Sequence, residues 1–443
     1  MNGLFKIKIK RNVPFITTMI VMCVLFFLRD NMDVNIPLVV FLCCSYVGIC
    51  FFRQEDFAVF GACITLFTHG VQTYYILLFA IVVYLFKYTK KIKNIKIFGF
   101  IMLLMIIELL HCFIQPFDFM EYIRYFISYA FIGIVLNDMS ELTNKEVAFM
   151  LKSFVLTYCF TMVDILMQLA NQAGNLAMFF TMDVRFGNLN VTQSANVVSL
   201  YDNENMIAMF SLIAISSCII LMFIEKKNNM FWLFMCAVAL FFGLNTFSKA
   251  FVIVLPFLFL MVIVTLIKDD KISIVKRMLV LFTVVVLVLI LANTIFSNAI
   301  GNIIERFNAG DITSGRSDLF SEYNEFFSNN PKYWFSGIGL QSLREKTGIS
   351  NTPHNGLQET VICFGALGIV IWSLIFRQIS IGAKKARKNK IKLLNLIPVV
   401  AFAMYTQSIQ FVRLPAIFLQ IIILSYAISA KYEYHRFNYK VKK

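Results

Sequence analysis

One of the four histidines in this chain is placed where it could act as a base. His354 lies in the polar segment 351–359 (NTPHNGLQE), immediately before a long apolar run. Thr352 suits the N-cap of a helix and Pro353 its first position, which would place His354 in the first turn. The positive end of the helix dipole favours the neutral imidazole there and also suits a nearby phosphate. The pattern predicts either a general base or an unreactive histidine at the water boundary, and position alone does not separate the two.

A set of basic residues indicates an anion-binding site. They fall in segments that the charge pattern, described below, places outside the cytoplasm, where Lys and Arg are scarce: Arg185, Lys249, Arg306, Arg316 and Arg413. A single cation at such a boundary often only extends its charge to water. Several together predict a bound anion, because Arg offers two-point contact to phosphate and Lys a point charge. A lipid pyrophosphate is the natural candidate.

Other ionisable residues lie in or beside apolar runs. Glu108 and Asp164 could line a cavity or pair within a helix bundle, and a structural role is expected for His111. Asp202 and Glu204 could bind a metal, but acids at a helix start are more often caps, and the cap is favoured here.

The elements that must position these residues are membrane helices. Hydrophobic residues make up 59% of the 443-residue chain and charged residues 15%, too little polar surface for a soluble protein of this size. Apolar runs long enough to cross a bilayer, about 20 residues, recur throughout. We expect an all-α polytopic membrane protein with about 14 transmembrane helices. The expected spans are 13–29, 36–52, 57–69, 71–86, 97–114, 121–136, 147–170, 204–224, 230–247, 250–267, 278–297, 356–376, 393–412 and 415–430.

The distribution of charge sets the expected orientation. The net charge of +15 comes largely from short basic stretches between apolar runs, which is typical of cytoplasmic loops. This pattern argues against a nucleic-acid partner, indicates contact with anionic lipids, and places both termini in the cytoplasm. The ten cysteines all fall in expected spans and are interpreted as small core residues.

Three regions are expected along the chain. Residues 1–170 form N-terminal transmembrane helices, residues 171–376 carry the candidate motifs, and residues 377–443 form C-terminal helices with a basic cytoplasmic tail. The middle region includes two long outer loops, 171–203 and 298–355. Within the second loop, Leu319, Phe320, Tyr323 and Phe327 recur at helical spacing and predict a short amphipathic helix in 317–327.

The order of these motifs resembles the O-antigen polymerase and O-antigen ligase family, membrane glycosyltransferases of the GT-C-like type. The matching elements run from Arg185 to Gly368: Arg185-Phe-Gly187, Asn203-Glu-Asn205 through Ala208, Ser248-Lys-Ala250, Ser314-Gly-Arg316, Gly337-Ile-Gly339, His354-Asn355 and Gly365 to Gly368. The sequence departs from the family at Lys249, where Arg is usual, and at Glu204, where Pro is usual.

The resemblance implies transfer of a glycan from undecaprenyl pyrophosphate to a sugar hydroxyl, with inversion and without metal or cofactor. It implies that the cations neutralise the pyrophosphate and that His354 orients or deprotonates the acceptor. The residues expected in the site are His354, Arg316 and Arg185 as catalytic groups, with Lys249, Asn355, Arg413, Asn203, Asn205, Gly337 and Gly339 binding substrate. For Arg413, a simple boundary role is an equal alternative.

Three functions remain open from the sequence. A polymerase of O-antigen, capsule or similar surface polysaccharide is favoured, located in the bacterial inner membrane, with the lipid-linked oligosaccharide, membrane lipids and a chain-length regulator as its expected partners. A ligase would instead transfer the glycan to lipid A core, in lipopolysaccharide, or to another acceptor. A flippase of lipid-linked oligosaccharides belongs to a different class. Such transporters commonly contain repeated halves, and no clear repeat is found here.

Overall fold

The structure is a computed structural model of the whole chain. The residues that it describes are 12–67, 73–88, 95–111, 113, 117–139, 144–173, 185–187, 204–224, 229–267, 297–308, 316–341, 343–351, 353–385, 396–409, 412–413, 418–420 and 424. The expected span 278–297, apart from its last residue, lies outside them, and so does most of the span 415–430.

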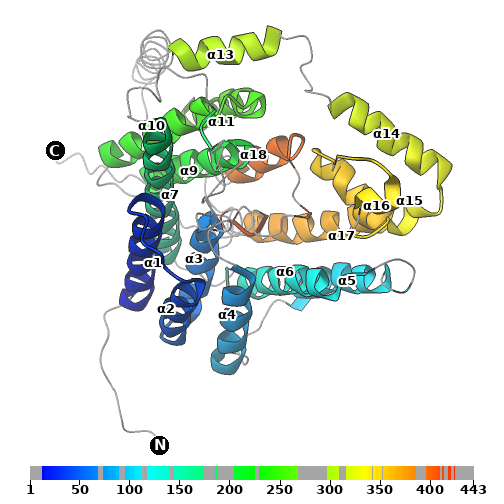
Figure 1. The fold of residues 1–443 in the computed structure, drawn as a ribbon, viewed down its shortest axis with the longest axis horizontal. Coiled ribbons are helices and arrows are strands. Elements are labelled where there is room, and N and C mark those ends of the chain that lie inside the picture. The colour runs from blue at the N-terminus through cyan, green and yellow to red at the C-terminus, as the bar shows by residue number, and fades with distance from the viewer. Residues whose placement is uncertain are drawn as a thin grey trace, which may run out of the picture.

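Every regular element in these ranges is a helix, as expected. Figure 1 shows the N-terminal helices beside the later ones in one bundle. The first group comprises α1 (Val13–Asn31), α2 (Leu38–Cys50), α3 (Gln54–Ile64) with the short 3-10 turn η1 (Thr65–Phe67), α4 (Thr73–Tyr88), α5 (Ile95–His111), α6 (Phe119–Met139) and α7 (Asn144–Ala173). The second group comprises α9 (Glu204–Ile224), α10 (Asn229–Asn245), α11 (Lys249–Ile267), α17 (Gly356–Lys385) and α18 (Ile397–Tyr405).

Helix length and composition are those of a membrane-embedded protein. Among the described residues, five helices are long and apolar enough to cross a bilayer, α1, α6, α7, α9 and α17, and α2, α4, α10 and α11 are shorter apolar helices. The larger number of about 14 spans remains a prediction.

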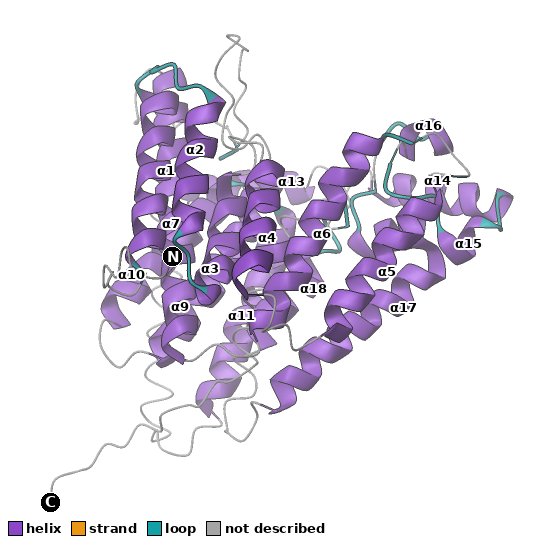
Figure 2. Cartoon of the chain, turned by 90° about the horizontal axis from the view of Figure 1, so that it is seen from below, coloured by secondary structure: helices purple, strands orange, loops and turns teal. Residues whose placement is uncertain are grey.

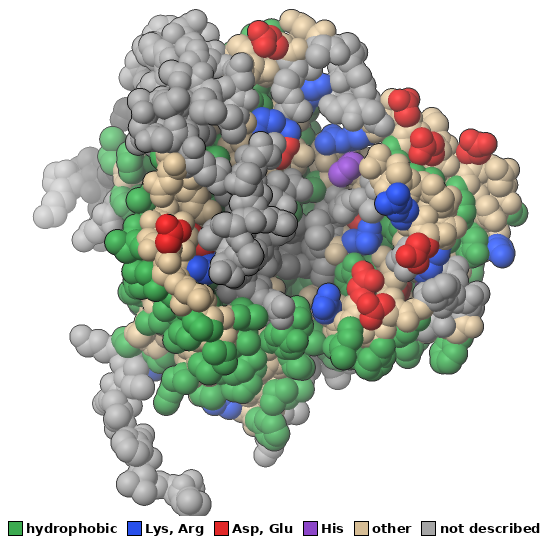
Figure 3. Space-filling model, viewed as in Figure 1, with side chains coloured by type: hydrophobic (Ala, Val, Ile, Leu, Met, Phe, Trp, Pro, Cys, Tyr) green, Lys and Arg blue, Asp and Glu red, His purple; other side chains and the backbone are tan. Residues whose placement is uncertain are grey.

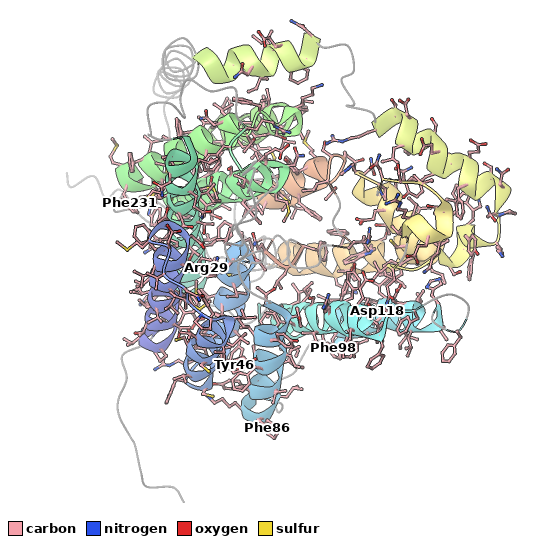
Figure 4. All side chains as sticks on the ribbon, in the orientation of Figure 1. Arg29, Tyr46, Phe86, Phe98, Asp118 and Phe231 are labelled. Carbon is pink, nitrogen blue, oxygen red and sulfur yellow. The ribbon has the colours of Figure 1, made fainter. Side chains whose placement is uncertain are left out.

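Large apolar side chains cover the outside of the bundle. Phe86 is 88% exposed and Phe231 is 42% exposed, and both lie on its periphery in Figure 4. Water would make such exposure unfavourable, whereas the acyl chains of lipids cover it at no cost.

Helix α9 forms the centre of the second group and packs against α7, α10, α11 and α18. Three of its buried serines are satisfied within the helix. Ser211, Ser216 and Ser217 each donate to the carbonyl four residues earlier, at 2.7–2.8 Å. These bonds allow hydroxyl groups to be buried among apolar side chains.

Asp164 pairs within the bundle, which is one of its two expected roles. Its carboxylate accepts hydrogen bonds from Asn31 Nδ2 at 2.6 Å and from Gln168 Nε2 at 2.9 Å. On α1, Arg29 Nε lies 2.6 Å from Asp30 Oδ1. This polar cluster joins α1 to α7.

The long segment predicted to be an outer loop contains short helices, as expected. They are α13 (Ser297–Asn308), α14 (Arg316–Asn329), α15 (Tyr333–Ser336) and α16 (Leu343–Thr347). The last three lie together near one end of α5, α6 and α17 (Figure 2), and we call α14–α16 the outer cap. The amphipathic helix expected at 317–327 is confirmed within α14, where Leu319, Tyr323 and Phe327 are buried, although Phe320 is 47% exposed.

Candidate functional site

The segment 185–187 lies against the turn that joins α10 to α11. Phe186 N donates to Asn245 O at 2.8 Å, and Arg185 Nε donates to Thr246 O at 2.9 Å. The ring of Phe186 is fully buried and packs on Phe242 of α10, with centroids 4.8 Å apart. Two motifs that are 61 residues apart therefore form one packed unit.

Arg185 already has an acidic partner. Its guanidinium forms an ion pair with Glu204 in the first turn of α9, and both side chains are largely but not fully buried. Glu204 is the residue that departs from the Pro usual in the resembling family. The positive charge of Arg185 is therefore compensated within the protein, which favours a role in positioning the start of α9.

A hydrogen-bonded cluster connects the start of α9 to the end of α18. Tyr405 OH donates to Asn205 O at 2.7 Å, and Ser248 Oγ donates to Asn205 Oδ1 at 3.3 Å. The hydroxyls of Ser248 and Tyr405 are 3.2 Å apart. The expected substrate residue Asn205 thus has both its side chain and its backbone engaged in the scaffold.

Sequence reasoning missed Tyr405, which is fully buried at the centre of this cluster. Both Arg185 and Arg316 act electrostatically on its hydroxyl. This tyrosine therefore lies within electrostatic range of both arginines. The only signal in the sequence was a tyrosine near the end of an apolar run.

The N-cap of α17 is Asn355, which corrects the expected assignment of Thr352. Asn355 Oδ1 accepts from Leu357 N and Gln358 N, both at 3.0 Å. Its amide Nδ2 donates to Gln407 Oε1 at 3.1 Å. The helix consequently begins at Gly356, and Asn355 has a capping and docking role in the observed arrangement.

The sequence predicted His354 in the first turn of this helix. In the structure His354 instead precedes α17. The helix start is shifted because Gly356 N bonds Thr406 O at 2.6 Å, so that the chain enters the helix at that point. Part of the His354 side chain is exposed, and the residue still lies close to the N-terminal end of the helix dipole.

Arg316, the first residue of α14, lies within electrostatic range of His354. The pKa of the His354 imidazole is lowered, first by the protein around part of the ring and then by the positive charge of Arg316. The imidazole is therefore predominantly neutral near pH 7. A neutral imidazole next to a guanidinium combines a base with an anion-binding group.

Two other expected cations are placed differently. The ammonium of Lys249, at the start of α11, lies 5.6 Å from the ring centroid of Phe307 on α13, and this contact links α13 to the bundle. The side chain of Arg306 and the whole of Asn203 fall outside the described residues.

Gly337 and Gly339 dock the outer cap onto a break in α17. Gly365 has φ 60° and ψ −154°, which interrupts the helix and frees carbonyl groups before it. Gly339 N donates to one of them, Cys363 O, at 2.9 Å. Gly337 has φ 74°, and a Cβ there would lie 2.4 Å from the backbone of Cys363, so the site requires glycine. In the structure this motif has a supporting role.

Glu108 of α5 binds the same glycine turn, at Leu340. Its Oε2 accepts from Leu340 N at 2.8 Å, and the carboxylate is 2% exposed. A Cβ on Gly339 would lie 3.2 Å from this oxygen. Lys346 adds a second attachment, from Nζ to Ile338 O at 2.8 Å.

Arg413 lies in a separate polar cluster. It lies within electrostatic range of Tyr125 of α6 and of Glu359. Glu359 Oε2 in turn accepts from Val412 N at 2.9 Å. With acidic and phenolic neighbours, Arg413 stabilises the packing of the 412–413 segment on α17 and does not extend the group formed by Arg316 and His354.

The observed contacts bring together only part of the expected site. Asn205 and Asn355 bond residues at the end of α18, Arg185 and Arg316 lie within electrostatic range of Tyr405 there, and His354 lies within electrostatic range of Arg316. Figure 3 shows a histidine and several Lys and Arg side chains gathered on one face. In the described part of the chain, no group of three His, Cys, Asp or Glu residues is arranged to hold a metal ion.

Comparison with protein-family models finds no match for the chain, and comparison with curated proteins finds no similar sequence. The case for a function therefore depends on the geometry of the site.

Proposed function

We propose that this chain is an inner-membrane glycosyltransferase that polymerises lipid-linked oligosaccharide repeat units. The donor is a glycan on undecaprenyl pyrophosphate, and the reaction takes place at the outer face. The observation that carries this proposal is that His354, a predominantly neutral imidazole, lies within electrostatic range of the Arg316 guanidinium and just before α17, a helix long and apolar enough to cross a membrane.

The two side chains suit the attacking hydroxyl and the leaving diphosphate of one displacement reaction. His354 accepts the proton of an acceptor hydroxyl while that oxygen attacks the anomeric carbon of the donor sugar. The bond from this carbon to the pyrophosphate oxygen breaks, and the electron pair leaves with the diphosphate, which Arg316 stabilises as its charge grows. Attack opposite the leaving group inverts the anomeric centre.

The remaining motif residues support this pair. Asn355 caps the helix that follows His354, and the ion pair of Arg185 with Glu204 fixes the start of α9. In this proposal they are positioning residues, because their polar groups are already engaged within the protein.

The test is incubation of the purified protein, in vesicles, with a lipid-linked repeat unit from its host, with products resolved as a gel ladder. Loss of the base in His354→Ala is expected to lower the rate by about 10²–10⁴-fold. Loss of the cation in Arg316→Gln is expected to lower it by about 10²–10³-fold. Arg344→Gln removes an exposed charge elsewhere on the cap and serves as the matched control.

The outcomes separate the three functions. A ladder on the lipid carrier that is absent in His354→Ala supports the polymerase. Transfer to lipid A core instead of the carrier shows a ligase. Movement of the lipid-linked unit across the vesicle membrane without bond formation shows a transporter and overturns the proposal.

A further inference from the structure

A groove lies between α14 and the segment 347–350 of the outer cap. Its volume is about 520 Å³, within the range of small-molecule sites. One wall is a face of α14, and the other is the turn that follows α16, residues 347–350. None of the motif residues considered above lines this groove.

Both walls belong to segments that also carry Arg316 or His354. Arg316 is the first residue of α14, and Ser350 of the second wall is four residues before His354 in the sequence. A hydrogen bond of 3.0 Å from Tyr323 OH to Asn351 O holds the walls together. At a rise of 1.5 Å per residue, Glu325 lies about 14 Å along α14 from Arg316. The groove therefore shares helix α14 with Arg316.

The lining combines strong hydrogen-bond acceptors with an apolar floor. Glu322, Glu325 and Asn329 line it from the same face of α14, while Phe326 and Ile349 supply apolar surface. Among the described residues, neither carboxylate has a hydrogen-bonding or ion-pairing partner. Two like charges at this spacing on one helix face repel each other. A ligand that donates hydrogen bonds to the carboxylates would reduce this repulsion.

We propose that this groove binds the sugar portion of the growing glycan, a few residues away from the bond being formed. Sugar hydroxyls donate to carboxylates through charge-assisted hydrogen bonds, and the apolar faces of sugar rings suit the floor at Phe326. The proposal deepens, and rests on, the polymerase function.

The charge distribution along α14 sets which part of the substrate lies where. A cation at the start of the helix attracts the diphosphate, and the acids further along repel it. Figure 3 shows acidic side chains at one edge of this part of the molecule, and acidic and basic side chains together over the rest of it. The groove therefore selects neutral sugars or amino sugars and disfavours uronic acids.

Binding is tested with the full-length protein and lipid-free oligosaccharides cut from the polymer of its host. The variant is Glu325→Gln, and Glu345→Gln, an exposed acid on α16, is the matched control. The loss of one charge-assisted hydrogen bond is expected to weaken binding about tenfold. Affinity should rise with oligosaccharide length, and the control should bind as the wild type does.

The polymerisation ladder is measured on the same variants. If the wild type polymerises and Glu325→Gln shortens the ladder while the joining of the first two units keeps its rate, the groove assignment holds. If polymerisation, ladder length and oligosaccharide affinity are all unchanged in Glu325→Gln, the groove assignment fails and the polymerase function stands. Saturable binding of calcium without any effect of oligosaccharide would show a cation site and would also overturn it. If oligosaccharide binds the groove but neither the wild type nor any variant joins repeat units, the polymerase function fails and the groove assignment stands.

Discussion

The role of Asn355 can be decided by a short series of substitutions. In the structure its side-chain oxygen caps α17 and its amide donates to Gln407. Asn355→Ala removes both interactions, whereas Asn355→Asp keeps a capping oxygen and loses only the donor. The two variants therefore separate helix capping from docking, and both from any contact with substrate.

The magnitudes follow from the two interactions. Loss of an N-cap costs about 1 kcal/mol, and loss of a neutral hydrogen bond costs about 1 kcal/mol. Asn355→Ala should weaken docking of the first part of α17 by about 2 kcal/mol, which is roughly 30-fold in the equilibrium. Asn355→Asp should weaken it by about 1 kcal/mol, or roughly fivefold.

Alkylation of Cys363, followed by mass spectrometry, provides the assay. This cysteine is fully buried on the first part of α17 and becomes accessible only when that part undocks. Its labelling rate should rise by the factors given above in Asn355→Ala and Asn355→Asp. Cys218, fully buried on α9, is the internal control, and its rate should stay constant in both variants.

One pattern would refute the capping interpretation. Unchanged labelling of Cys363 in Asn355→Ala, together with loss of glycosyl transfer in both variants, would mean that the amide contacts substrate directly. Recovery of most activity in Asn355→Asp would instead support capping, since Asp and Asn cap helices about equally well.

Two further predictions concern the pair at the site and the glycine turn. Because Arg316 lowers the pKa of His354, Arg316→Gln should raise that pKa toward, but not up to, its ordinary value, since burial still acts. The pH profile of His354 modification by diethyl pyrocarbonate should move to higher pH, and an unmoved profile would exclude an electrostatic contact. Gly337→Ala should abolish folded protein, because its Cβ would collide with the backbone of Cys363. Gly348→Ala has a similar φ of 72° but open space; it should cost only about 1–2 kcal/mol of backbone strain, and equal yields of the two variants would contradict the clash.

The sequence by itself determined the class of the protein and several of its local elements. A chain with 59% hydrophobic residues has too little polar surface to fold in water, so a bundle of apolar helices follows from composition alone. The amphipathic helix in the outer loop also follows from local spacing, because Leu319, Tyr323 and Phe327 recur on one face.

Local sequence was insufficient where several residues competed for one role. Thr352 and Asn355 are both good N-cap types, and the sequence pattern favoured Thr352. The structure selects Asn355 because Gly356 and Asn355 bond the residues that follow α18, about 50 positions later in the chain. No local propensity contains that information.

Only the tertiary structure decided which acidic groups lie near the expected cations. Glu204 pairs with Arg185, and Glu359 lies within electrostatic range of Arg413. Pairing between side chains depends on which helices meet, and that follows from packing of the whole bundle. The physical reason is that charge compensation acts through space, at separations along the chain that no sequence motif records.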